Sequence, residues 1–146
     1  MKHSTHRVRR ANTFLAGISA ILALSSFAAS AQTHAGGATW TIQPTPNRSN
    51  DFNELTATTT TSTADAWAVG TFRGPSSPAF KTLIEHFDGT SWRAVPSPNV
   101  GPSYNELNAV SADSSTDAWA AGFAFSGNAN RTLTEHWTGT AWSVVP

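Results

Sequence analysis

The 146-residue chain contains one unit of about fifty residues that occurs twice. A shift of 52 residues aligns the first part of the two copies: NEL at 53–55 with NEL at 105–107, and DAWAVG at 65–70 with DAWAAG at 117–122. After a two-residue deletion, a shift of 50 aligns TLIEHFDGTSW at 82–92 with TLTEHWTGTAW at 132–142. Because a repeated unit buries its apolar residues against neighbouring units, this duplication limits the possible folds more than the composition does.

Each unit is predicted to form four short strands separated by turns. The expected strands are 55–60, 65–72, 82–87 and 91–96 in the first copy, and 107–112, 117–125, 132–137 and 141–146 in the second. The sequences DGTS and TGTA predict glycine-containing hairpin turns between the third and fourth strands. Pro96 and Pro146 cannot donate a hydrogen bond to a ladder, which places the fourth strand at a sheet edge.

Four antiparallel strands within about fifty residues are typical of a β-propeller blade. The motifs DAWAVG, TLIEHFDGTSW, VPSPN and NEL also resemble a repeat of secreted bacterial kelch-like (galactose-oxidase-type) β-propeller proteins. The resemblance covers residues 39–146 and implies an all-β fold with two complete blades, at about 53–96 and 105–146, but no particular activity. The segment TWTIQP, 39–44, is predicted to be a surplus N-terminal outer strand.

Two blades cannot close a ring, because propellers typically contain 4 to 8 blades. Three interpretations remain open. The chain is a fragment of a longer propeller, or three or four copies assemble into a ring of six or eight blades, or it is an open two-blade sandwich. The surplus outer strand favours the fragment.

Residues 1–31 have the features of a secretory signal peptide, followed by a short linker at 32–38. A basic start precedes the apolar run 14–24 and the small-residue stretch SSFAASAQ, with cleavage expected after Ala31. The predicted location is therefore extracytoplasmic, by general or twin-arginine export and without membrane insertion after cleavage. The remaining chain has five Lys and Arg against nine Asp and Glu, a formal charge of −4, which argues against a nucleic-acid partner.

The pair Glu85-His86 recurs as Glu135-His136. Adjacent strand residues point to opposite faces, so neither pair can converge on one metal or substrate atom. A Glu between apolar neighbours is expected to accept hydrogen bonds from the backbone or an indole NH, and the aspartates before Ala-Trp are expected to cap turns. Residues that recur once per blade are predicted to be structural: Asp65, Trp67, Glu85, His86, Trp92, Asp117, Trp119, Glu135, His136 and Trp142.

No catalytic residue, cofactor or metal site is predicted. A copper site of the galactose-oxidase type requires tyrosines and a cysteine, whereas this chain has one tyrosine and no cysteine. The arginines are scattered, there is no nucleophile elbow, and no Asp-rich loop provides the converging oxygens that calcium needs. Enzymatic activity of this chain alone is not expected.

Binding is the favoured function, because the loops on one rim combine aromatic and Asn residues. The candidate binding residues are Phe52, Asn53, Phe80, Tyr104 and Asn105. Aromatic rings stack on apolar ligand faces while polar groups supply hydrogen bonds. The prediction is an exported binding or scaffold module whose partners are other copies, missing blades, a glycan or an extracellular protein. The alternatives are a self-assembling lectin and an accessory part of a secreted hydrolase or oxidase.

Overall fold

The structure is a computed structural model that describes residues 32–33 and 39–146. The chain divides into two units, Met1–Ile42 and Gln43–Pro146. In the first unit, β1 (Gln32–Thr33) pairs antiparallel with β2 (Thr39–Trp40). The predicted signal peptide, 1–31, and residues 34–38 of the predicted linker lie outside the described residues.

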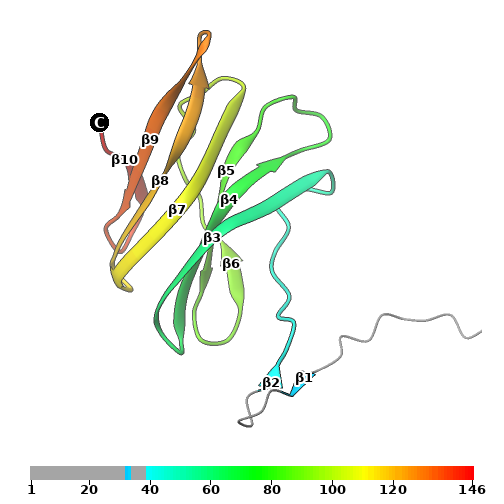
Figure 1. Cartoon of the computed structure of the whole chain (residues 1–146), viewed down its shortest axis with the longest axis vertical. Helices are drawn as coiled ribbons and strands as arrows, with labels where there is room; N and C mark the ends of the chain where they lie inside the picture. The colour runs from blue at the N-terminus through cyan, green and yellow to red at the C-terminus, as the bar shows by residue number, and fades with distance from the viewer. Residues whose placement is uncertain (1–31, 34–38) are drawn as a thin grey trace, which may run out of the picture. The chain divides into compact units, whose positions relative to one another are not determined.

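The second unit consists of two four-stranded antiparallel sheets, each following chain order (Figure 1). The first sheet contains β3 (Phe52–Ser62), β4 (Asp65–Arg73), β5 (Lys81–Phe87) and β6 (Trp92–Ala94). The second contains β7 (Tyr104–Ser114), β8 (Asp117–Ser126), β9 (Ala129–Trp137) and β10 (Trp142–Val144). The described residues contain no helix, and therefore none that is long and apolar enough to cross a membrane. The predicted all-β class and the order of the strands in each unit are confirmed.

The segment 39–44, predicted to be a surplus outer strand, is a strand over its first two residues. Only Thr39 and Trp40 are extended in a ladder, and their partners are Gln32 and Thr33. In the two larger sheets, β5 and β9 are already paired with β6 and β10. Each of these sheets therefore already contains its own fourth strand.

The turns follow the predicted glycine chemistry. Gly89 and Gly139 have φ angles of 89° and 87°, in the left-handed region that favours glycine. Between the second and third strands, the first sheet has a loop at 74–80, whereas the second has a tight turn in which Gly127 has a φ of 66°. The deletion recognised in the sequence thus shortens this connection.

The two sheets pack through faces of different composition. We call the side of each sheet that carries Trp67 or Trp119 its Trp face, and the side that carries Ala68 or Ala120 its Ala face. The shared core contains Trp67, Val69 and Ile84 from the first sheet and Leu107, Ala118, Ala120, Leu133 and Trp142 from the second. Small alanines allow the close approach of the neighbouring sheet, as predicted. The Trp face of the first sheet therefore lies against the Ala face of the second.

Hydrogen bonds fix this contact along β7, which runs beside β3 (Figure 1). The hydroxyl of Thr56 donates to the carbonyl of Leu107 at 2.5 Å, and that of Thr71 donates to the carbonyl of Asn105 at 2.9 Å. A buried backbone carbonyl that keeps a partner avoids a cost of roughly 1–3 kcal/mol. The polar contacts thus set the register in which the apolar faces meet.

Candidate functional site

A continuous series of aromatic rings lies at one rim of the second unit. The ring centroids of Phe52 and Phe80 are 5.5 Å apart, and those of Phe80 and Tyr104 are 4.7 Å apart. Tyr104 and Phe123 follow at 5.5 Å with ring planes only 7° apart. The structure thus brings together three aromatic residues predicted from the sequence and adds Phe123, which the loop-based prediction missed. The spacing of two residues between Phe123 and Phe125 in β8 could have indicated this, because alternate residues of a strand lie on the same face.

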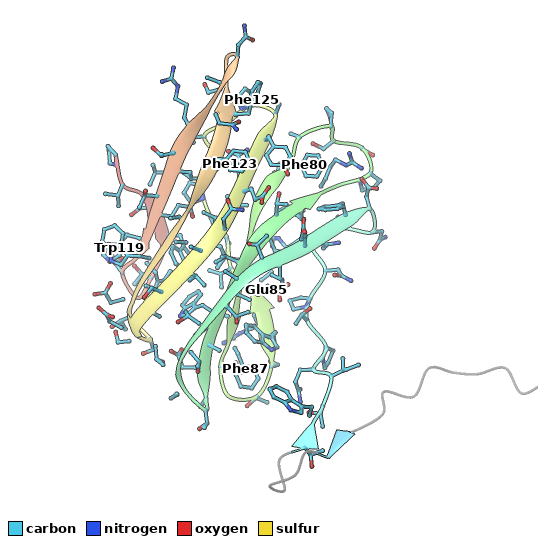
Figure 2. All side chains as sticks on the ribbon, viewed as in Figure 1. Phe80, Glu85, Phe87, Trp119, Phe123 and Phe125 are labelled. Atoms are coloured by element: carbon cyan, nitrogen blue, oxygen red, sulfur yellow. The ribbon has the colours of Figure 1, made fainter. Side chains whose placement is uncertain are left out.

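The rings border a groove of about 430 Å³. Its lining residues are Pro78, Phe80, Ser103, Tyr104, Phe123, Phe125 and Asn130. Figure 2 shows Phe80, Phe123 and Phe125 at the same end of the two sheets. The lining contains no formally charged side chain, and its polar groups are the hydroxyls and amide of Ser103, Tyr104 and Asn130. The groove therefore offers stacking surfaces with a few hydrogen-bonding groups beside them.

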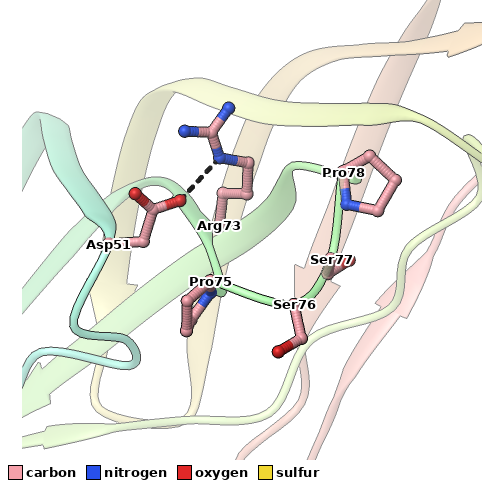
Figure 3. A pocket seen from close by; sticks show the side chains of 6 residues that line it. All are labelled: Asp51, Arg73, Pro75, Ser76, Ser77 and Pro78. Atoms are coloured by element: carbon pink, nitrogen blue, oxygen red, sulfur yellow. Dashed lines mark hydrogen bonds and ion pairs between the residues drawn. The ribbon is translucent and has the colours of Figure 1, made fainter.

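A second hollow of about 580 Å³ adjoins this groove at Pro78 (Figure 3). It is lined by Asp51, Arg73, Pro75, Ser76, Ser77 and Pro78. The Nε of Arg73 donates to Oδ2 of Asp51 at 2.8 Å, and the guanidinium carbon lies 4.9 Å from the ring centroid of Phe80. Asp51 therefore balances the charge of Arg73, and the guanidinium lies over the Phe80 ring in a cation–π contact.

Tyr104 remains protonated in this setting. Burial, followed by the hydrogen bond to Glu106 and the charge of that carboxylate, raises the pKa of Tyr104 to about 12. The phenol donates to Oε2 of Glu106 at 2.8 Å. Its proton is thus engaged by the protein, while its oxygen can still accept a hydrogen bond from a ligand.

The two predicted asparagines hold loops instead of facing the groove. Asn105 is buried, and its Oδ1 accepts from the Gly101 amide at 2.7 Å. Its Nδ2 donates to the Phe80 carbonyl at 3.0 Å, which ties the two sheets together. Asn53 makes the corresponding local bonds, accepting from the Arg48 amide at 2.8 Å. Their side-chain amides therefore hold the loops of the rim in place.

We expect Asn105→Ala to lower the free energy of unfolding by about 1–3 kcal/mol, because it leaves buried backbone groups without partners. Urea unfolding followed by tryptophan fluorescence measures this change. Asn53→Ala is the matched control and should cost less, since Asn53 is half-buried and has no bond that joins the two sheets. A larger loss in Asn53→Ala would contradict the assigned role of Asn105.

Each sheet also contains an Asp-His pair beside its central tryptophan. His86 Nε2 lies 2.6 Å from Asp65 Oδ1, and the imidazole stacks on Trp67 at 4.1 Å. Burial alone would raise the pKa of Asp65, but hydrogen bonds from Thr61 and His86 outweigh this effect and lower it.

The second sheet repeats the arrangement. His136 Nε2 lies 2.8 Å from Asp117 Oδ1, and its ring stacks on Trp119 at 4.1 Å. The aspartates therefore bind histidines of the neighbouring strand, a role that differs from the predicted turn capping. The sequence did not indicate these Asp-His pairs, because the two residues of each pair are far apart in the chain. They meet only when the second and third strands of a sheet are in register.

Two buried glutamates lie on the Ala faces, opposite the histidines, as the strand alternation predicts. Glu85 pairs with Ala68 in the ladder, whereas His86 pairs with Trp67. The predicted hydrogen bonds are incomplete: among the described residues, both carboxyl oxygens of Glu135 and Oε2 of Glu85 have no partner. Desolvation raises the pKa of Glu85 to about 7 and that of Glu135 to about 8.

Comparisons with known proteins do not identify this arrangement: no family model, curated protein or solved structure matches the chain. Within residues 32–33 and 39–146, no group of three or more His, Cys, Asp or Glu side chains is placed to hold a metal ion. The aromatic groove is therefore the feature from which a function can be argued.

Proposed function

We propose that the chain forms two blades of a kelch-like β-propeller and acts outside the cytoplasm as a non-catalytic binding module. Two observations support the propeller. Each sheet is a four-stranded antiparallel meander, and successive sheets pack the Trp face of one on the Ala face of the next. Such packing can continue from unit to unit in one direction, as radial repetition of blades requires.

The ligand that best fits the aromatic groove is a neutral saccharide. The single observation that carries this proposal is the series Phe80, Tyr104 and Phe123 along a groove of about 430 Å³. Sugar rings present apolar C–H faces that stack on aromatic rings, while their hydroxyls need the hydrogen-bonding groups found in this lining. The absence of charge in the lining, and the pairing of Arg73 with Asp51, favour a neutral sugar over an anionic one.

We expect Tyr104→Ala and Phe123→Ala each to weaken saccharide binding by about tenfold, because removal of a stacking ring costs on the order of 1 kcal/mol. The full chain is first applied to an array of neutral and acidic oligosaccharides. The best-bound sugar is then titrated by calorimetry into the wild type and both variants.

Trp40→Ala is the control, since Trp40 is an exposed aromatic residue that belongs to the other unit. It should bind the same sugar as tightly as the wild type. Exclusive binding of acidic sugars, equal weakening in Trp40→Ala, or no binding to any saccharide would each contradict the proposal.

A further inference from the structure

The two central tryptophans occupy the same position in the repeat but differ sharply in exposure. Trp67 is 0% exposed, whereas Trp119 is 43% exposed. Each stacks on its own histidine at 4.1 Å, so the local geometry of the two sites is the same. The difference arises because the second sheet covers the Trp face of the first, while the Trp face of the second sheet is open.

The Ala faces show the converse difference at two positions, whereas Ala68, Leu83 and Glu85 at the centre of the first sheet's Ala face are buried like their copies. Leu107, in the second sheet, is 0% exposed within the shared core, but its copy Leu55 in the first sheet is 38% exposed. Trp142 is likewise buried, and its copy Trp92 is only half-buried. The first sheet therefore carries more exposed copies of two of the residues, Leu107 and Trp142, with which the second sheet packs against Trp67.

We propose that a second copy of this chain supplies the missing cover. The Ala face of the first sheet of one copy would lie on the Trp face of the second sheet of the next copy. In this arrangement Leu55, Phe87 and Trp92 take the positions that Leu107, Trp137 and Trp142 hold within one chain.

The contact inside the chain is the template for this pairing. Trp67 lies 5.1 Å from Trp137 and 5.4 Å from Trp142, measured between ring centroids. On the first sheet, Phe87 and Trp92 form an equivalent pair with centroids 5.5 Å apart, close to the 6.0 Å between Trp137 and Trp142. A hollow of about 230 Å³ beside Trp119 leaves room for side chains of the arriving copy. Its lining residues are Ala109, Val110, Ser111, Trp119, Ala120, Ala121 and Thr134.

Three substitutions between the repeats make the proposed contact weaker than the contact inside the chain. Ala121 and Thr134 replace the buried Val69 and Ile84, which reduces the apolar area available. Phe123 stands at the position of Thr71, so the hydroxyl that bonds across the two sheets is missing, and the proposed contact competes with a saccharide for this ring. We therefore expect association that depends on concentration.

The two surfaces of the contact are different, which makes it heterologous. Such contacts close into rings when the rotation between copies permits, and otherwise form open chains. Two to four copies would supply the roughly four to eight blades of known propellers.

Sedimentation of the full chain, expressed with its N-terminal segment so that the host processes it, tests the proposal. The wild type should form oligomers whose mass grows with concentration. Trp119→Lys and Leu55→Lys should each be monomeric, because each places a charge in one half of the contact. An equimolar mixture of the two variants should form a 1:1 heterodimer, since each variant retains the surface that the other has lost.

Val100→Lys is the matched control, because Val100 is 53% exposed and lies outside all strands. It should assemble like the wild type, and near-ultraviolet circular dichroism should show that every variant keeps the native fold. Should Trp119→Lys fail this check, Trp119→Ala replaces it, with the same expected loss of assembly. A wild type that stays monomeric at its highest soluble concentration, or a mixture that does not pair, would overturn the proposal.

Discussion

Replacement of Trp67 by alanine should lower the free energy of unfolding by roughly 3–5 kcal/mol. Trp67 is fully buried at the centre of the contact between the two sheets, where it touches Trp137 and Trp142. Its removal leaves a cavity that the rigid ladders on either side cannot fill. Urea unfolding, recorded at low protein concentration by far-ultraviolet circular dichroism, measures the change.

Trp119→Ala is the matched control, because the two tryptophans occupy the same position in the repeat and each stacks on the histidine of its own sheet. Trp119 is already 43% exposed, so its loss should cost less than about 1 kcal/mol in the monomer. Equal losses in the two variants would contradict the packing of the first Trp face on the second Ala face. Low concentration matters here, since association of copies would bury Trp119 and add to its apparent contribution.

The strands were predictable from the sequence because their signals are local. Alternation of small and large residues in DAWAVG fixes which side chains share a face, and glycines in DGTS and TGTA specify the turns. The duplication strengthens each strand prediction, because the same strand has to fit the sequences of both copies of the repeat. The same alternation placed Glu85 and His86 on opposite faces.

The asymmetry between the copies could not be predicted in this way. Trp67 and Trp119 have nearly identical neighbours in the sequence, and only the packing of the sheets decides which of them is buried. The same holds for the groove, because Phe123 lies in a strand instead of a loop and is brought onto Tyr104 only by the pairing of β7 with β8. Asn105 is a residue type that often binds ligands when it lies in a loop beside aromatic residues. Its hydrogen bonds to Gly101 and Phe80 are instead structural.

Glu135 gives the fold an unusual dependence on pH. The carboxyl is fully buried between the sheets, and no described residue bonds either of its oxygens. Burial therefore favours the neutral form and raises its pKa to about 8, from an ordinary value of 4.5. In the unfolded chain the same group loses its proton near its ordinary pKa.

The stabilisation that comes from a neutral Glu135 is complete below about pH 4.5 and is lost as the pH rises towards about 8. Across that interval the unfolded state binds fewer protons than the folded state, so the free energy of unfolding should fall by a few kcal/mol. Glu135→Gln removes the titrating group but keeps its size and polarity, and its stability should be nearly independent of pH over the same range. Urea unfolding at a series of pH values measures both curves.

Two variants separate this effect from other titrations in the molecule. Glu85→Gln should flatten the curve only up to about pH 7, the pKa to which burial raises that carboxyl. Glu54→Gln is the matched control, because it makes the same substitution at an exposed carboxyl. A Glu135→Gln curve parallel to that of the wild type would show that Glu135 is ionised in the folded protein, with a partner other than the described side chains.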